Sequence, residues 1–85
     1  MANTITVMWT IKAMIDNEGK QEIVYAYGPA ENIYTALGSA KSQIARSFPK
    51  VDTATIQIHY ILADPGAVIH DWTVLEESEV EKREE

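Results

Sequence analysis

Cysteine is absent from this chain of 85 residues, and proline and glycine are scarce, with three and four residues respectively. Without cysteine the chain forms no disulfide and no thiolate metal site. No stretch approaches the roughly 18 consecutive apolar residues of a membrane-spanning helix. Residues 1–12 lack the basic region and the continuous apolar run of a signal peptide. We therefore expect a cytoplasmic protein without a membrane partner.

Basic residues are also few, with seven Lys and Arg against 13 Asp and Glu, which gives a net charge of −6. Residues 76–85 hold six acids and two bases, and residues 1–75 hold the remaining seven acids and five bases. A chain with a net negative charge does not attract a phosphate backbone, so we expect no nucleic-acid partner. The composition predicts one domain over residues 1–75, followed by a solvated acidic tail over residues 76–85.

The spacing of the apolar residues changes from one segment of the chain to the next. Residues 4–15 and 20–27 alternate, residues 30–48 repeat with helical spacing, residues 54–63 alternate again, and residues 68–75 form a short apolar run. This order predicts an α+β fold of ββαββ type: a four-stranded, mainly antiparallel sheet with one helix packed on one face.

The first two strands are expected to form a hairpin through a three-residue loop, Asn17–Gly19, with Gly19 in the left-handed region. This loop pairs Ala13 with Ile23 and Ile11 with Tyr25. The predicted core face of the hairpin therefore holds Trp9, Ile11, Ala13, Ile15, Ile23, Tyr25 and Tyr27. The second face holds Met8, Lys12, Met14, Val24 and Ala26.

The helix is expected to begin near Pro29, which suits a first helical turn, although Asn32 could cap a slightly later start. Its apolar stripe consists of Ile33, Ala36, Leu37, Ala40, Ile44 and Phe48. Small residues in the middle of the helix, Gly38 among them, would let it lie close on the sheet. Pro49 should stop the helix after Phe48.

The last two strands are expected to pair through a tight turn at Asp64-Pro65-Gly66. Tyr60 and Leu62 then face the core with Ile56 and Ile58, and His59 and Ile61 face away. The register of residues 68–75 leaves two alternatives for Trp72 and His70, one inside and one outside. We favour a packed Trp72 because of its size.

A sheet with one helix leaves its second face uncovered. Apolar residues on that face form a patch that monomers rarely leave bare. Either the sheet curls, or a second copy or a host or other partner protein covers this face. We expect a homodimer, because the second face is apolar and the core is small. The candidate interface residues are Met8, Met14, Val24, Ile61, His59 and Trp72.

Residues with catalytic or metal-binding chemistry are few. The helical serines do not lie in a nucleophile-elbow sequence, so we assign no catalytic residue and expect no enzyme and no cofactor. The alternative is a small-ligand or metal-binding module, in which the hairpin of the last two strands brings His59 and His70 together beside Asp71. Spacing alone is a weak signal, and we assign no metal ligand.

The order ββαββ resembles compact modules found in small phage and mobile-element proteins, including some anti-defence inhibitors. The resemblance lies in the order of elements and not in a residue motif. It implies an accessory protein that binds and inhibits a host protein, and that acts in the host cytoplasm if the chain is phage-encoded. A non-enzymatic protein-interaction module is the function that the sequence favours.

Overall fold

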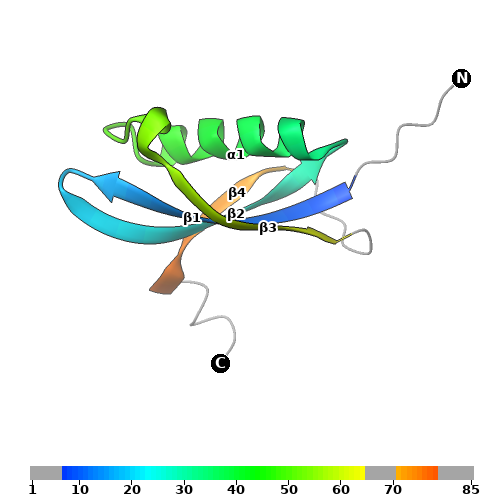
Figure 1. The fold of residues 1–85 in the computed structure, drawn as a ribbon, viewed down its shortest axis with the longest axis horizontal. Coiled ribbons are helices and arrows are strands. Elements are labelled where there is room, and N and C mark those ends of the chain that lie inside the picture. The colour runs from blue at the N-terminus through cyan, green and yellow to red at the C-terminus, as the bar shows by residue number, and fades with distance from the viewer. Residues whose placement is uncertain (1–6, 65–70, 79–85) are drawn as a thin grey trace, which may run out of the picture.

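The computed structural model describes residues 7–64 and 71–78, which form a four-stranded antiparallel sheet with one helix packed against it (Figure 1). The predicted α+β class and ββαββ order are confirmed. The elements are β1 (Val7–Asn17), β2 (Lys20–Ala30), α1 (Ile33–Ser47), the 3-10 turn η1 (Thr53–Thr55), β3 (Gln57–Asp64) and β4 (Thr73–Glu76). The predictions for Pro65, Gly66, His70 and residues 79–85 lie outside the described residues.

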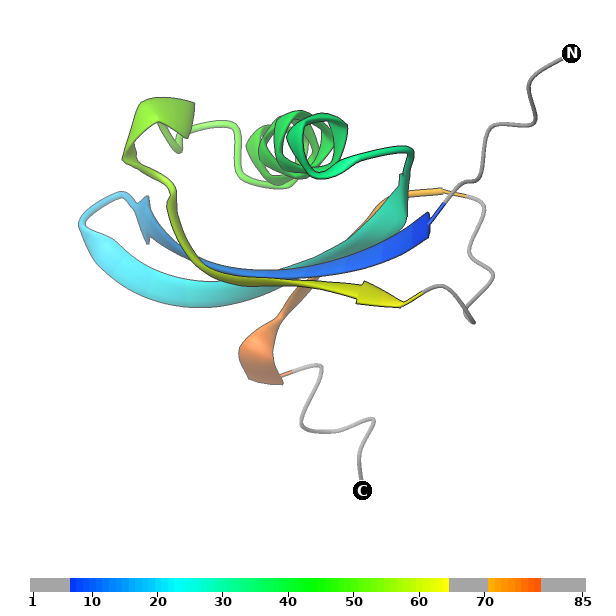
Figure 2. The same ribbon diagram turned by 45° about the vertical axis from the view of Figure 1, so that its right-hand side comes forward.

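The strand order is β3-β1-β2-β4, so the first hairpin forms the centre of the sheet and the last two strands form its opposite edges (Figure 2). The predicted hairpin between residues 54–63 and 68–75 is therefore wrong, because β3 pairs with β1 and β4 pairs with β2. At the end of β4, Glu76 pairs with Val24. The sheet thus extends one residue past the predicted domain end at residue 75.

The turn between β1 and β2 has two residues, Glu18 and Gly19, with φ angles of 56° and 86°. Turns with two positive φ angles match the twist of the flanking strands. The Gly19 amide donates a hydrogen bond of 2.8 Å to Asp16 Oδ1, which stabilises the turn. Asn17 therefore pairs with Lys20, and the predicted three-residue loop is wrong by one residue.

This change of one residue reverses the faces of β2, because side chains alternate along a strand. Ile11 pairs with Ala26, and Ala13 pairs with Val24. The β2 residues on the helix side are Val24, Ala26, Gly28 and Ala30, all of them buried. Ile23, Tyr25 and Tyr27, which were expected in the core, lie on the opposite face and are half-buried.

Local signals fix both ends of α1. Asn32 is the N-cap, and its side-chain oxygen accepts a hydrogen bond of 2.9 Å from the Thr35 amide. The later of the two expected starts is therefore confirmed, and Pro29 belongs to β2 instead of the first helical turn. The helix ends at Ser47 with Phe48 as its C-cap, one residue before the predicted end, and Pro49 follows.

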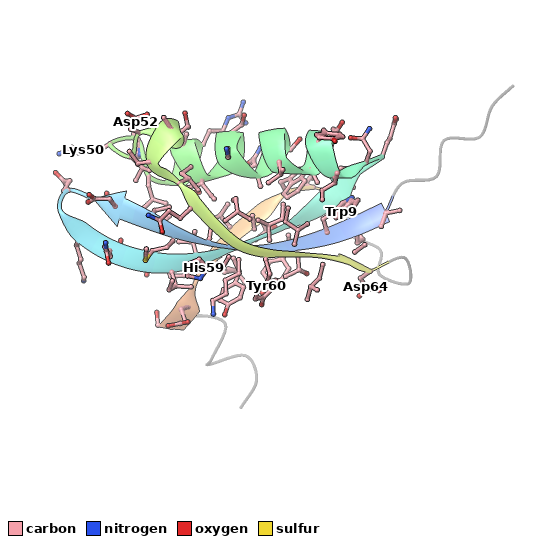
Figure 3. The ribbon with its side chains drawn as sticks, viewed as in Figure 1. Trp9, Lys50, Asp52, His59, Tyr60 and Asp64 are labelled. Carbon is pink, nitrogen blue, oxygen red and sulfur yellow. The ribbon has the colours of Figure 1, made fainter. Side chains whose placement is uncertain are left out.

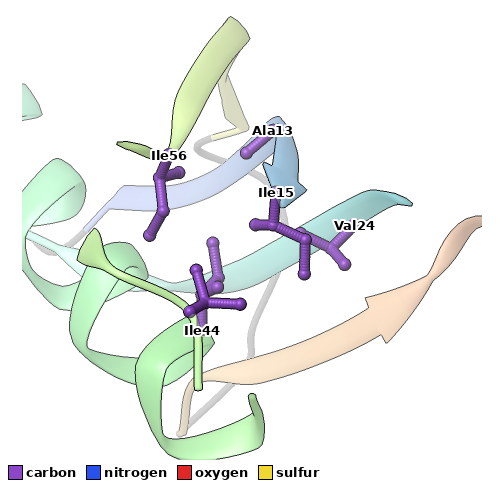
Figure 4. Packing of buried hydrophobic residues seen from close by; sticks show 6 residues of the cluster. Ala13, Ile15, Val24, Ile44 and Ile56 are labelled. Atoms are coloured by element: carbon purple, nitrogen blue, oxygen red, sulfur yellow. The ribbon is translucent and has the colours of Figure 1, made fainter. Parts of the chain in front are cut away.

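The core lies between α1 and the sheet in two adjoining clusters. The first consists of Ala13, Ile15, Val24, Ile44, Val51 and Ile56, most of which are drawn in Figure 4. The second is built mainly from alanines and consists of Ile11, Ala26, Ala30, Ala36 and Ala40. From α1, Ala36, Ala40 and Ile44 are fully buried, whereas Leu37 is half-buried and Gly38 is exposed. The close approach of helix and sheet thus depends on alanines and not on Gly38.

A bulge in β3 reverses the faces that were predicted for the residues that follow it in this strand. The pairing of β1 with β3 shifts between Lys12 and Ala13, so that Lys12 lies opposite Tyr60 and Ala13 lies opposite Ile58. His59 is the extra residue, and a bulge of this kind changes which side chains face each side of the sheet. Beyond the bulge, Ile61 turns to the helix side and packs on the core.

Both tryptophans lie on the helix side, at the end of the sheet where α1 begins, and Figure 3 shows Trp9 between sheet and helix. Trp9 Nε1 donates a hydrogen bond of 3.1 Å to the Ala30 carbonyl oxygen, and Trp72 Nε1 donates one of 3.1 Å to the Pro29 carbonyl oxygen. The Trp72 indole lies directly against Gly28. The favoured prediction of a packed Trp72 is confirmed.

Candidate protein-binding face

The sheet face opposite α1 is called the open face below. Among the described residues, only the end of β4 and the helical residues 77–78 lie on that side of the sheet (Figures 1 and 2). The strand registers align its side chains in rows that cross the four strands. The middle row consists of Leu75, Tyr25, Lys12 and Tyr60. The next row consists of Thr73, Tyr27, Thr10 and Leu62. The open face is therefore an aromatic and aliphatic surface with a lysine near its centre.

Lys12 occupies the centre of the middle row, between two tyrosines. Its Nζ atom lies 5.8 Å from the centroid of the Tyr25 ring and 5.9 Å from that of the Tyr60 ring. A cation within about 6 Å of an aromatic centroid is attracted by the ring quadrupole. The two rings thus hold the ammonium group on the face from either side, while the lysine side chain remains half-buried.

Two tyrosines of β2 extend this aromatic surface along the strand. The rings of Tyr25 and Tyr27 are stacked, with centroids 6.3 Å apart and an angle of 15° between their planes. Stacking restricts both rings before any partner arrives, and rigid aromatic side chains lose little conformational entropy on binding.

The most exposed large apolar side chains of the described strands lie on β3. Leu62 is 57% exposed and Tyr60 is 39% exposed. Both belong to the open face, and Figure 3 shows Tyr60 on the side of the sheet away from α1. A contiguous surface of this composition is characteristic of a protein-binding site.

The structure separates the predicted interface residues. Met14 lies on the open face and is half-buried, and His59 is exposed at the bulge, so their interface role stays a prediction. The placement of Val24 and Ile61 on that face is wrong, because both pack on the helix side. Trp72 also packs on the helix side, in agreement with the favoured register, so it does not belong to the open face.

Met8 does lie in register with the open face, opposite Pro29 and Asp64, but it is only 4% exposed. Its side chain is therefore not available to a partner in this conformation. The candidate set thus reduces to Met14 and His59 from the residues singled out in the sequence.

The structure does not form the predicted His59–His70 hairpin. β3, which carries His59, lies at the opposite edge of the sheet from β4, and His70 is outside the described residues. Within the described part of the chain, no group of three or more His, Asp or Glu side chains is arranged to hold a metal ion. The predicted pairing of the last two strands, on which that alternative depended, is therefore wrong.

Sequence reasoning missed Tyr25, Tyr27, Tyr60 and Leu62 as surface residues because it assigned them to the core. One signal in β2 could have placed two of them correctly. The residues between and after the tyrosines, Ala26, Gly28 and Ala30, are all small. Small side chains let a helix approach a sheet closely, and that spacing indicates which face the helix covers.

Comparisons with models of protein families, with curated proteins and with solved structures find no match for this chain. Within residues 7–64 and 71–78, no helix has the length and apolar character needed to cross a membrane.

Proposed function

We propose that this protein is a non-enzymatic interaction module that binds another protein through its open face. The single observation that carries the proposal is the row of Leu75, Tyr25, Lys12 and Tyr60, which crosses all four strands on the side of the sheet opposite α1. Tyrosine is enriched among the energetically dominant residues of protein interfaces, and aromatic residues in general are enriched at interface cores.

Lys12 supplies the specificity of this surface. Its ammonium group lies beside two rings and among apolar side chains, where a partner that docks would exclude water. A charge-assisted hydrogen bond is strong in such a setting, and an unmatched ammonium group there is costly. The partner therefore presents a carboxylate or a group of carbonyl oxygens to Lys12, surrounded by apolar side chains.

A protein fits this face better than a nucleic acid does. Stacked aromatic rings on a sheet can bind single-stranded bases, but such sites also need a positively charged groove along the backbone. The chain has a net charge of −6, and its open face centres on one lysine. Repulsion of phosphate groups by the whole molecule opposes that use.

The test begins with a photo-crosslinking amino acid placed at residue 60 or at residue 34. Tyr34 is 83% exposed on α1 and provides a matched tyrosine on another surface. We expect a specific crosslinked protein from residue 60 and none from residue 34. Mass spectrometry then identifies the partner for purification.

The affinity of the purified partner is then measured by calorimetry with Tyr60→Ala, Lys12→Ala and Tyr34→Ala. Truncation of a central interface residue typically costs about 2 kcal/mol or more. We therefore expect Tyr60→Ala and Lys12→Ala each to weaken binding about 30-fold, and Tyr34→Ala to leave it unchanged. Equal affinities for all three variants would refute the assignment of the open face.

A further inference from the structure

The outer edge of β3 is one of the two edges of the described sheet. β3 pairs with β1 on one side, and no described strand pairs with its other side. α1 packs on β2, β4 and β1, so β3 lies at the margin of the region covered by the helix. The unpaired backbone groups of such an edge are a template for another strand.

The sequence of β3 carries few of the features that protect an edge. Edge strands commonly bear lysines or prolines, or are very short. β3 has eight residues, QIHYILAD, with no lysine and no proline, and its one acid is Asp64 at the end. By contrast, β4 at the other edge has four residues and ends in Glu76.

The bulge at His59 protects only the beginning of β3. A bulge disrupts regular pairing on its strand. The regular edge that remains is Tyr60–Asp64, five residues that include the two large apolar side chains exposed on β3, Tyr60 and Leu62.

We propose that this edge pairs with the same edge of a second copy of the chain, antiparallel and centred on Leu62. In this register Leu62 lies opposite Leu62 of the second copy, Ile61 opposite its Ala63, and Tyr60 opposite its Asp64. It is the one self-pairing register that uses all five bulge-free residues. The two sheets then form one continuous eight-stranded sheet with both helices on the same side.

The side chains match in this register. Leu62 meets an identical exposed leucine on the open face, where each covers the other. The Tyr60 hydroxyl faces a carboxylate, which can accept its hydrogen bond. The two Asp64 residues lie four positions apart along the strands, about 13 Å, so like charges do not meet. Like charges directly opposite one another would be destabilising. The seam is therefore self-complementary, as a two-fold interface requires.

Single-cysteine crosslinking tests the register, because the native chain has no cysteine. Residues directly opposite in an antiparallel pair have Cα atoms about 4.5–5.5 Å apart, within the range of about 4.4–6.8 Å that a disulfide spans. Under mild oxidation we expect Leu62→Cys to form a reducible covalent dimer in high yield. The controls are Tyr60→Cys, whose thiols would lie about 14 Å apart in the dimer, and Thr73→Cys at the other edge.

Equal yields from the three variants, or no dimer from Leu62→Cys, would overturn the proposal. Light scattering provides an independent measurement: wild type should have twice the mass of Leu62→Lys, which places two ammonium groups on the two-fold axis. Leu62 is 57% exposed, so the lysine variant should keep its fold, as checked by circular dichroism. If the wild-type protein still has the mass of a monomer at millimolar concentration, the proposal is also overturned. The dimer does not rest on the proposed function, and Tyr25→Ala should leave it intact.

Discussion

Replacement of Gly28 by alanine should disrupt the packing of Trp72. Gly28 lies in β2 on the helix side, and its φ angle is not positive, so the backbone itself accepts alanine. A methyl group at this position would, however, overlap Cγ, Cδ2 and Cε2 of the Trp72 indole. These atoms belong to the rigid indole ring system, so a small rotation at the end of a flexible side chain cannot relieve the overlap. The indole must therefore move as a unit.

The expected cost follows from what the indole loses. Forcing extra atoms into a packed core typically costs about 1–3 kcal/mol. Displacement of Trp72 also breaks its 3.1 Å hydrogen bond to the Pro29 carbonyl oxygen, a loss of about 1 kcal/mol. The conformational gain of alanine over glycine offsets about 0.5–1 kcal/mol. We expect a net loss of about 2 kcal/mol, equivalent to a fall of about 8–16 °C in the melting temperature of a domain this small.

Urea unfolding followed by circular dichroism measures this loss. Substitution of Trp9 by phenylalanine in all variants leaves Trp72 as the one tryptophan, so its fluorescence reports directly on the indole environment. A double-mutant cycle with Trp72→Ala identifies the cause. If the overlap is responsible, Gly28→Ala costs almost nothing once the indole is absent. The reasoning would be refuted if Gly28→Ala lowered the free energy of unfolding equally with Trp72 and with Ala at position 72. It would also be refuted if Gly28→Ala changed that free energy by less than about 0.5 kcal/mol and left the Trp72 fluorescence native.

Three further predictions concern the helix and the C-terminal residues. Ile44→Ala should cost about 2–5 kcal/mol in thermal or urea unfolding, and clearly more than Leu37→Ala, because Ile44 is fully buried and Leu37 is half-buried; equal costs would mean that the helix is rotated about its axis. Gly38→Ala should stabilise the protein by about 0.5–1 kcal/mol, since an added methyl group meets no atom within 4 Å, and a lower melting temperature would contradict this. A chain that ends at Ser78 lacks four acids and one apolar residue, Val80, and should melt within a few degrees of the full chain; early melting or precipitation would show that the deleted residues pack on the body.

The sequence predicted those features that depend on neighbouring residues. Asn32 caps α1 because its side chain reaches an amide three residues on, and Pro49 ends it because proline cannot continue the helix. The alternating and helical periods located β1, β2, α1 and β3 to within a few residues, whereas η1 was not predicted and β4 begins later than the predicted strand. These signals act over one or two turns of chain and need no knowledge of the tertiary structure.

The faces of β2 could not be assigned from apolarity, because both faces of this strand are apolar. The face depends on whether the turn after Asp16 has two or three residues, and a one-residue difference exchanges Tyr25 for Ala26 under the helix. The hydrogen bond from Gly19 to Asp16 selects the two-residue turn. An error in one turn residue thus moved the whole aromatic surface into the predicted core.

The edge positions of β3 and β4 depend on contacts between distant segments. The sequence around Pro65 suggested a tight turn, and a tight turn implies neighbouring strands. The structure instead places β4 beside β2, where Trp72 lies against Gly28 and Val74 packs on both core clusters. The position is set by the space beside the helix, which no local turn signal reports.

Side-chain size, more than apolarity, distinguishes the two faces of the central strands. Where α1 lies close to the sheet, β2 contributes Ala26 and Ala30, and α1 contributes Ala36 and Ala40, so the two layers meet through methyl groups. Large rings at these positions would hold the helix away and open cavities. The rings lie instead on the open face. The distribution of side-chain size that allows a close helix therefore also gathers the tyrosines on the opposite side of the sheet, which is the surface that the proposed binding function would use.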